Sequence, residues 1–373
     1  MTDLAFDKLR RWPDIEADNL FAVDASDRLL LDGAADSLAA AGPGEAVIIG
    51  DRYGALTLAA AHSGATGIRT HQDELSGERA LDANAAALSM TDAVDHRPLD
   101  ASLVRGARVV LLQLPRSLDA LAEIAELIAR HAESDVRVFA GGRIKHMTRA
   151  MNEVLGQYFG TVTASLAQQK SRVLIASDPR PPEGAPAWPA REFHSDLGIE
   201  VVAHGAAFAG TKVDIGTRFL LEFLDAVPDV ADAIDLGCGT GILATALARA
   251  RPGIRVIASD QSAAAVASAR ETALANGVAD RVTVVRDDGL SAQADASSSL
   301  ILLNPPFHVG ATVHAGIAHK LFADAARVLK PGGELVAVWN SHLGYRSTLE
   351  RTIGPTRQLG RNAKFTVTAS TRR

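Results

Sequence analysis

The chain has 373 residues, of which 47% are hydrophobic and 22% are charged, and its formal net charge is −6. This length exceeds the size at which one hydrophobic core usually stops growing, so we expect two domains. No apolar run approaches the roughly 18 residues that cross a bilayer, and the single cysteine, Cys238, excludes an internal disulfide and a cysteine-bound metal.

The start of the chain, Met1 to Arg11, lacks the apolar segment of a signal peptide, so we expect a cytoplasmic protein. The negative net charge argues against a nucleic-acid partner. Basic residues nevertheless gather near the C-terminus, where only Glu350 is acidic: Arg346, Arg351, Arg357, Arg361, Lys364, Arg372 and Arg373. They could contact phosphates, or they could form a solvated edge of the last helix and strands.

Short apolar runs alternate with helical segments in both halves of the chain, which predicts α/β domains with doubly wound, mostly parallel sheets. A proline-rich stretch without apolar periodicity separates the halves and is typical of an extended linker. Its prolines are Pro179, Pro181, Pro182, Pro186 and Pro189. The sequence therefore predicts a domain at 1–178, a linker at 179–192 and a domain at 193–373.

The two halves repeat one layout, which predicts a duplicated domain. An apolar strand at 47–51 precedes a glycine-bearing turn and a helix at 56–61, and the strand at 233–237 precedes a similar turn and a helix at 243–248. Farther along, 111–115 matches 302–306. The late strands at 136–140 and 334–339 then correspond.

The first copy differs from the second at the positions that would approach a ligand. Ile48 replaces Asp235, and Arg52 places a bulky cation where the second copy has Gly239. Three further positions differ in the same way: Gln113, Leu114 and Arg116 stand where Asn304, Pro305 and Phe307 stand in the second copy. We therefore expect a degenerate N-terminal copy that kept the fold, lost its cofactor, and serves as a scaffold and in substrate placement.

A glycine-rich turn follows the strand that ends near Asp235, and its glycines are Gly237, Gly239 and Gly241. Such a loop lets the backbone press against a nucleoside-bearing ligand, although a tight strand-to-helix connection is the plain alternative. A dinucleotide-binding loop would have its third glycine at Ile242, which disfavours a nicotinamide oxidoreductase. Asp235 suits a cationic or hydroxyl-rich ligand.

Acidic residues follow the next two strands. Asp260 comes after the strand at 254–258, about twenty residues beyond the glycines, where a carboxylate can accept both ribose hydroxyls. A helix cap is the alternative use of this segment, since Ser262 and an alanine-rich helix at 263–275 follow. Asp287 and Asp288 follow the strand at 282–285, and we favour Asp288 as the acceptor for an adenine amino group.

The strand at 300–303 runs into Asn304, Pro305, Pro306, Phe307 and His308. Two prolines fix a rigid, non-helical turn at the carboxyl end of a strand, where doubly wound sheets bind ligands. The Asn304 amide oxygen and the Pro305 carbonyl can then face a planar amino group, and Phe307 offers a face on which a base stacks. We predict Asn304, Pro305, Pro306 and Phe307 as the catalytic segment.

Together these segments resemble class I S-adenosylmethionine methyltransferases that act on exocyclic or amide nitrogens. The resemblance is closer to the bacterial ribosomal RNA guanine 2-amino methyltransferases, which have tandem methyltransferase-like domains with a degenerate N-terminal copy. The stretch 208–221 also resembles the part of that family that precedes the glycine loop and encloses the cofactor. This similarity adds four cofactor-side residues: Phe208, Asp214, Gly216 and Thr217.

The resemblance implies transfer of a methyl group from S-adenosylmethionine to the 2-amino group of a guanine in ribosomal RNA, here expected in the small subunit. Phe307 and His308 would contact the substrate base, and Asn304 would also face the cofactor. No metal and no membrane are expected, and we expect a monomer. Three alternatives remain: methylation of an adenine amino group, methylation of a protein glutamine, and a non-catalytic RNA-binding assembly protein.

Overall fold

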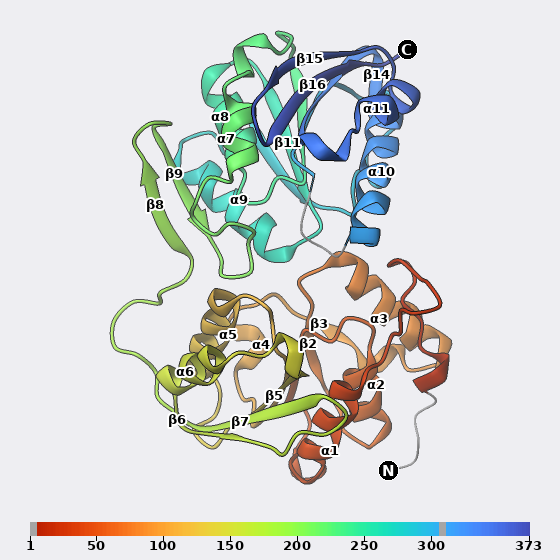
Figure 1. Ribbon diagram of the computed structural model, residues 1–373. Coiled ribbons are helices and arrows are strands. Elements are labelled where there is room, and N and C mark those ends of the chain that lie inside the picture. The colour runs from red at the N-terminus through yellow and green to blue at the C-terminus, as the bar shows by residue number, and fades with distance from the viewer. Residues whose placement is uncertain (1–5, 306–310) are drawn as a thin grey trace. The chain divides into compact units, whose positions relative to one another are not determined.

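The computed structural model describes residues 6–305 and 311–373, with the side chains of 311–315 left out. The chain divides into two compact units, Met1–Trp188 and Pro189–Arg373. In Figure 1 the first unit runs from red to yellow-green and the second from green to blue. Each unit has its own seven-stranded sheet.

The N-terminal unit has a sheet in the strand order β3-β2-β1-β4-β5-β7-β6. Its first five strands are parallel neighbours, and β7 runs antiparallel to β5 and β6. The strands are β1 (Ala46–Ile49), β2 (Arg69–His71), β3 (Asp95–His96), β4 (Val109–Gln113), β5 (Arg137–Arg143), β6 (Phe159–Ala164) and β7 (Ser171–Pro179). The helices are α1 (Ala25–Ala40), α2 (Ala55–His62), α3 (Leu75–Ala87), α4 (Ala101–Val104), α5 (Leu118–His131) and α6 (Arg149–Tyr158).

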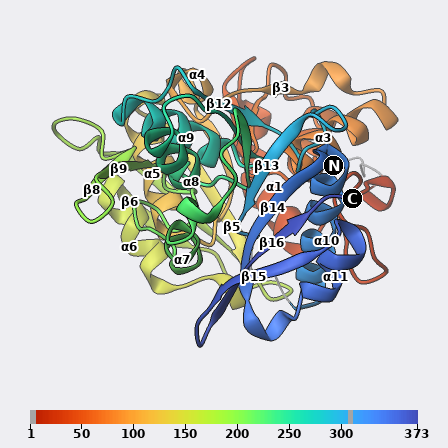
Figure 2. The ribbon, with the colours of Figure 1, turned by 90° about the horizontal axis from the view of Figure 1, so that it is seen from above.

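The C-terminal unit repeats this order as β12-β11-β10-β13-β14-β16-β15. Figure 2 shows β14, β16 and β15 side by side at one end of the sheet. The strands are β10 (Asp232–Leu236), β11 (Arg255–Asp260), β12 (Val282–Arg286), β13 (Ser298–Leu303), β14 (Leu329–Asn340), β15 (Thr356–Arg361) and β16 (Phe365–Thr371). The helices are α7 (Ile215–Leu221), α8 (Ile242–Ala250), α9 (Ala263–Ala275), α10 (Ala311–Val328) and α11 (Arg346–Thr352).

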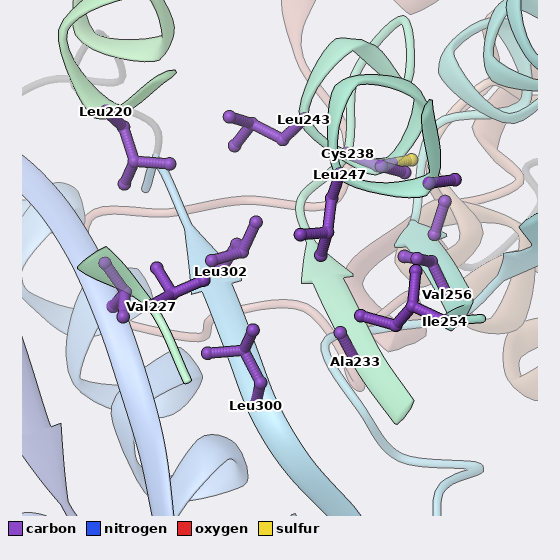
Figure 3. Packing of buried hydrophobic residues seen from close by; sticks show 14 of the residues in the cluster. Leu220, Val227, Ala233, Cys238, Leu243, Leu247, Ile254, Val256, Leu300 and Leu302 are labelled. Atoms are coloured by element: carbon purple, nitrogen blue, oxygen red, sulfur yellow. The ribbon is translucent and has the colours of Figure 1, made fainter. Parts of the chain in front are cut away.

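The central strand β13 is apolar from Leu300 to Leu303 because both of its faces are buried there, as is usual in parallel sheets. Leu300 and Leu302 pack with α8 and α9, whereas Ile301 and Leu303 pack with α10 and α11 on the other face. Figure 3 shows the first of these clusters gathered between the sheet and α8. The N-terminal sheet is covered in the same way, by α1, α2 and α3 on one face and by α4, α5 and α6 on the other.

The identical strand order confirms the expected fold class of two tandem Rossmann-like α/β domains. Both sheets are mostly parallel, and each ends in an antiparallel pair that the sequence analysis did not foresee. The burial pattern does not distinguish a parallel from an antiparallel neighbour here, since the parallel β13 and the antiparallel β16 are both buried on both faces. The helix expected at 263–275 has the bounds of α9.

The proline-rich stretch lies between β7, which ends at Pro179, and a two-stranded antiparallel sheet of β8 (Ala190–His194) and β9 (Ile199–Ala203). The segment 180–189 contains no helix or strand. Its backbone is nevertheless held, because the Glu126 carboxylate of α5 accepts the Ala187 N–H at 3.1 Å. Among the described residues, no helix is long and apolar enough to cross a membrane.

Candidate active site

The candidate site lies at the carboxyl ends of β10, β11, β12 and β13. These strands are parallel and adjacent, with Asp235 paired to both Ala258 and Leu302. Parallel strands end at one edge of the sheet, so the loops that follow them lie together there. The residues expected to bind the cofactor from these four strand ends are therefore brought to one edge.

The glycine loop after β10 is built from left-handed backbone. Gly237, Gly239 and Gly241 have φ values of +71°, +52° and +76°, which disfavour side chains. A Cβ atom at Gly237 or Gly239 would have no neighbour within 4 Å, so these two glycines border open space. A Cβ atom at Gly241 would lie 2.9 Å from that of Ala269, so this third glycine permits α8 and α9 to pack closely.

Asp235 lies beneath this loop and is 1% exposed. Its Oδ2 accepts the Ala244 N–H at 3.0 Å in the first turn of α8, while Oδ1 has no hydrogen-bond partner among the described residues. Burial raises the pKa of Asp235 to about 7, the hydrogen bond from Ala244 opposes this rise, and the nearby Asp260 adds to it. The side chain thus has an unused acceptor and would favour a cationic neighbour.

Asp260 connects the glycine loop to the second strand. Its Oδ2 accepts the Gly239 N–H at 2.9 Å and its Oδ1 accepts the Ser262 N–H at 3.0 Å. Ser262 itself caps α9 by accepting the Ala265 N–H at 3.1 Å. The helix cap considered for this segment is therefore Ser262, and the Asp260 carboxylate joins the glycine loop to the start of α9.

The two acids after β12 have different environments. Asp287 is buried, and it accepts the Ala292 N–H at 2.8 Å and the Ser291 hydroxyl at 2.5 Å. The less buried Asp288 lies 2.5 Å from the Lys320 ammonium of α10. Asp287 is thus used within its own turn, whereas Asp288 has an exchangeable partner. Lys320 was not predicted, because it is 32 positions from Asp288 and no local pattern connects the two.

Asn304 follows β13 and is fixed through its amide nitrogen. Nδ2 donates to Asp214 Oδ2 and to Thr217 Oγ1, both at 3.0 Å. Asp214 caps α7, because the same Oδ2 accepts the Gly216 N–H at 2.8 Å and the Thr217 N–H at 3.2 Å. The Asn304 amide oxygen is buried and has no hydrogen-bond partner among the described residues. With both N–H groups used, the amide presents an unpaired acceptor.

Gly216 makes room for this arrangement. A Cβ atom built there would lie 3.0 Å from Asp214 Oδ2 and 3.1 Å from Asn304 Oδ1. Any larger residue would press on the amide that Asp214 and Thr217 hold. The resemblance had placed Asp214, Gly216 and Thr217 beside the cofactor, and the structure gathers all three around Asn304.

The structure describes only some of the remaining expected site residues. Phe208 is 60% exposed in the turn before α7, and Pro305 is buried directly after Asn304. Pro306, Phe307 and His308 lie outside the described residues, so their expected contacts with a base stay predictions. The basic residues near the C-terminus are partly used within the fold: Arg357 pairs with Glu334 at 2.9 Å and Arg346 with Glu350 at 3.0 Å.

The N-terminal unit holds other residues at the equivalent positions. Ile49 pairs with Leu112 as Leu236 pairs with Leu303, so Gln113 and Asn304 are the next residues in equivalent strands. The hydrogen bonds from Gly50 to His71 and from Gly237 to Ser259 align the loops in the same manner. This alignment places Gln72 opposite Asp260 and Arg52 opposite Gly239.

Arg52 pairs with Glu74, the N-cap residue of α3, at 3.4 Å and does not have a left-handed backbone. The N-terminal loop therefore lacks both the open glycine and the carboxylate that the C-terminal loop combines. One feature is retained, since Gln113 donates to Asp27 in the first turn of α1. This bond parallels the one from Asn304 to Thr217 in the first turn of α7.

Two family models match the chain: the RLMG N-terminal domain over residues 2–180, and the methyltransferase small domain over residues 198–369. Ribosomal RNA large subunit methyltransferase G of Streptomyces avermitilis is 35% identical over 374 residues, covering 96% of this chain and 95% of that protein. The Pseudomonas entomophila protein of the same name is 34% identical over 360 residues, covering 96% of each. The chain belongs to the ribosomal RNA large subunit methyltransferase G family.

Membership in the methyltransferase G family confirms the expected class I methyltransferase with S-adenosylmethionine as its cofactor. Among solved structures, the 16S rRNA N2 methyltransferase of T. thermophilus in complex with AdoMet and guanosine has a TM-score of 0.72. It is 22% identical and covers 94% of this chain and 92% of that chain, so the two-domain fold is shared.

The described residues fit this cofactor. Gly237 and Gly239 border open space, the Asp260 carboxylate holds the Gly239 N–H at the end of β11, and the unpaired Asp235 Oδ1 suits a cationic group. Among the residues that the structure describes, no group of three or more His, Cys, Asp or Glu side chains is arranged to hold a metal ion.

Proposed function

We propose that the chain transfers a methyl group from S-adenosylmethionine to the 2-amino group of a guanine in ribosomal RNA. The observation that carries this proposal is the buried, unpaired amide oxygen of Asn304, which only a donor such as an amino group can satisfy. The names of the relatives support ribosomal RNA as the acceptor. The solved neighbour is in complex with guanosine, which supports guanine as the base.

The cofactor supplies an electrophilic methyl group on a sulfonium sulfur. A bond forms between the substrate nitrogen and the methyl carbon while the carbon–sulfur bond breaks, and the nitrogen then loses one proton to solvent. Asn304 Oδ1 accepts a hydrogen bond from the substrate amino group. This bond draws the lone pair of the amino nitrogen out of conjugation with the ring and stabilises the positive charge that develops on that nitrogen. Asp214 and Thr217 hold the amide so that this acceptor needs little reorganisation.

The small ribosomal subunit was expected from the sequence, whereas the curated relatives are named for the large subunit. We propose large-subunit RNA as the substrate, because relatives that are 34–35% identical over nearly the whole chain weigh more than a solved neighbour at 22%. The expectation of the small subunit is kept as the second arm of the same assay.

The test supplies labelled S-adenosylmethionine with undermodified large-subunit and small-subunit RNA, each free and assembled, and identifies the labelled nucleoside. N2-methylguanosine from one RNA supports the proposal and names the subunit. Label in N6-methyladenosine or in a ribosomal protein would instead favour the adenine or glutamine alternative. RNA binding without any methyl transfer would favour an assembly protein.

The variant Asn304→Ala tests the role of the amide. We expect its turnover to fall by about 100-fold or more, as for other preorganised donors and acceptors, while S-adenosylmethionine still binds. Gln113→Ala, at the equivalent position of the N-terminal unit, is the matched control and should keep wild-type turnover. Wild-type turnover in Asn304→Ala would disprove this role.

A further inference from the structure

The turn that follows β12 is attached to α10 by side chains of that helix. Lys320, Asp324 and Arg327 are spaced four and three residues apart, so they lie on one face of α10. Asp324 Oδ2 accepts the Leu290 N–H at 3.2 Å, and Arg327 donates to the Leu290 carbonyl at 2.6 Å. Gly289 permits this approach, because an added Cβ atom there would collide with Asp324 Oδ2. Two of the three side chains therefore fasten the backbone of the turn.

Lys320, the third side chain, pairs with a carboxylate instead. Among the described residues its one polar partner is Asp288, whose Oδ2 lies 2.5 Å from the Lys320 ammonium. In the same part of the chain, the Asp288 side chain has no other polar partner. The lysine side chain is 49% exposed and the aspartate side chain 19% exposed, so both can be reached from solvent. The pair keeps further N–H donors on the ammonium and a second carboxylate oxygen for a ligand.

The pair lies at the edge of the sheet that holds the glycine loop. β12 and β11 are parallel neighbours, so the turn of Asp288 follows the strand next to β11. The Ser259 hydroxyl donates to the Gly289 carbonyl at 2.9 Å, and the Ser259 carbonyl accepts the Gly237 N–H at 2.8 Å. One residue of β11 thus joins the turn of Asp288 to the loop that borders open space.

An ion pair of this kind presents a hydrogen-bond acceptor beside a donor. Adenine has the complementary edge, because its 6-amino group donates and the adjacent ring nitrogen N1 accepts. Guanine and hypoxanthine have the reverse order, since a carbonyl oxygen accepts where the amino group of adenine donates and an N1–H donates beside it. A carboxylate alone recognises the amino group, whereas a carboxylate with a lysine beside it can recognise both atoms of the adenine edge.

We propose that Lys320 is a specificity-determining residue for the cofactor. Its ammonium donates a hydrogen bond to adenine N1 while Asp288 accepts one from the 6-amino group. Lys320 also neutralises the Asp288 carboxylate, which lowers the cost of covering that charge with a base. This inference goes beyond the proposed function, because it concerns recognition of the cofactor and not of the methyl acceptor. It rests on the prediction that Asp288 faces adenine, and a separate variant tests that prediction.

The test measures binding of S-adenosylhomocysteine and of two analogues by calorimetric titration. Carbon replaces adenine N1 in the 1-deaza analogue and adenine N7 in the 7-deaza analogue. The wild-type chain should bind the 1-deaza analogue about tenfold more weakly than the parent ligand, because a hydrogen bond from a charged donor is lost. The 7-deaza analogue is the control for replacement of a ring nitrogen, and its Kd should stay close to that of the parent ligand.

Lys320→Met removes the donor and the charge and keeps a side chain of similar length. We expect its Kd for S-adenosylhomocysteine to rise about tenfold and to equal its Kd for the 1-deaza analogue, since N1 then has no partner in either ligand. Lys330→Met is the matched control. Lys330 also pairs with an aspartate, Asp232 at 2.8 Å, which is the first residue of β10 and lies at the opposite end of the sheet. This control should keep the wild-type Kd for all three ligands.

A wild-type chain that binds the parent ligand and the 1-deaza analogue equally would overturn the inference, as would a Lys320→Met variant that still prefers the parent ligand. Tighter binding of the parent ligand by Lys320→Met would also overturn it, because Lys320 would then compete with adenine for Asp288. Wild-type affinity in Asp288→Ala would reject the adenine contact and the inference together. Absence of methyl transfer to guanine would reject the proposed function alone, since this binding is measured without a methyl acceptor.

Discussion

Asn304 shows how a single side chain is fixed by what surrounds it. Both of its amide protons are used, by Asp214 Oδ2 and Thr217 Oγ1, and its oxygen is left buried without a partner among the described residues. An unpaired buried acceptor costs free energy in the absence of a ligand, on the order of 1–3 kcal/mol. A donor that fills this place recovers that cost on binding.

Gly216→Ala tests how sensitive this arrangement is to position. The added methyl group would lie 3.1 Å from Asn304 Oδ1, so the amide must shift by a few tenths of an ångström. We expect turnover at saturating substrate to fall about tenfold, because misplacement of a reacting group is costly. Stability should change by less than about 1 kcal/mol, since Ala favours the helix.

The control for Gly216→Ala is Gly156→Ala in α6, where an added Cβ meets nothing within 4 Å. It should leave turnover unchanged. The prediction would be contradicted by a Gly216→Ala enzyme as active as this control, or by a Gly216→Ala protein that lost activity only because it failed to fold.

At the scale of elements, Asp235 connects β10 to the start of α8 and does so as a buried carboxyl. Its pKa in the folded protein is about 7, because of burial, against 3.8 as its ordinary value. Between these two values the folded state binds more protons than the unfolded state. The free energy of unfolding therefore falls as pH rises through this window, and the contribution of the protonated group is lost above pH 7.

Asp235→Asn removes this titration. We compare the difference in melting temperature between the variant and the wild type at pH 5 and at pH 8. We expect this difference to be roughly 4–8 °C more favourable to the variant at pH 8, which corresponds to about 2 kcal/mol of unfolding free energy for a domain of this size. The measurement is thermal melting without cofactor at both pH values. The exposed Asp229→Asn serves as the control for charge, and a melting difference that does not depend on pH would refute the prediction.

The elements could be predicted from sequence where a local signal and a buried face agree. The helix at 263–275 was found because Ser262 caps it and alanines fill one face, and β13 because four apolar residues run into prolines. The β8–β9 hairpin was missed, and the linker was extended into β8. The exposed side chains of β8 show little apolar pattern. The strand β9 is held by side chains of α9, which is distant in sequence: the Thr272 hydroxyl accepts the Val202 N–H at 3.0 Å.

The site could be predicted only in part, for a similar reason. Residues at strand ends, such as Asp235, Asp260 and Asn304, follow apolar runs and could be proposed from that spacing. Other contacts of the site join distant segments. Lys320 pairs with Asp288, and Asn304 forms hydrogen bonds with Asp214 and Thr217, which lie 90 and 87 positions away. No local pattern records such contacts, and the resemblance to a family supplied Asp214, Gly216 and Thr217.

At the scale of the whole molecule, two copies of one fold carry unequal sites. We expect one molecule of S-adenosylmethionine to bind per chain, because the N-terminal copy has Arg52 and Gln72 where the other has Gly239 and Asp260. Calorimetric titration measures this stoichiometry. Asp260→Ala should raise the Kd at least about tenfold, since the ribose contacts and the bond to Gly239 are both lost.

Gln72→Ala, at the equivalent position, is the matched control for Asp260→Ala and should leave the affinity unchanged. Two molecules bound per chain, or a loss of affinity in Gln72→Ala, would show that the N-terminal copy retains a cofactor site.

Both copies have a hydrogen bond from a side-chain amide to the first helix of the unit. Gln113 donates to Asp27 in one copy, and Asn304 donates to Thr217 in the other. The N-terminal copy keeps this hydrogen bond although its loop lacks the open glycine, so the bond does not depend on a glycine loop beside it. The fold itself can therefore hold a side-chain amide at the end of the fourth strand. The residues above the amide then decide whether its oxygen faces a ligand.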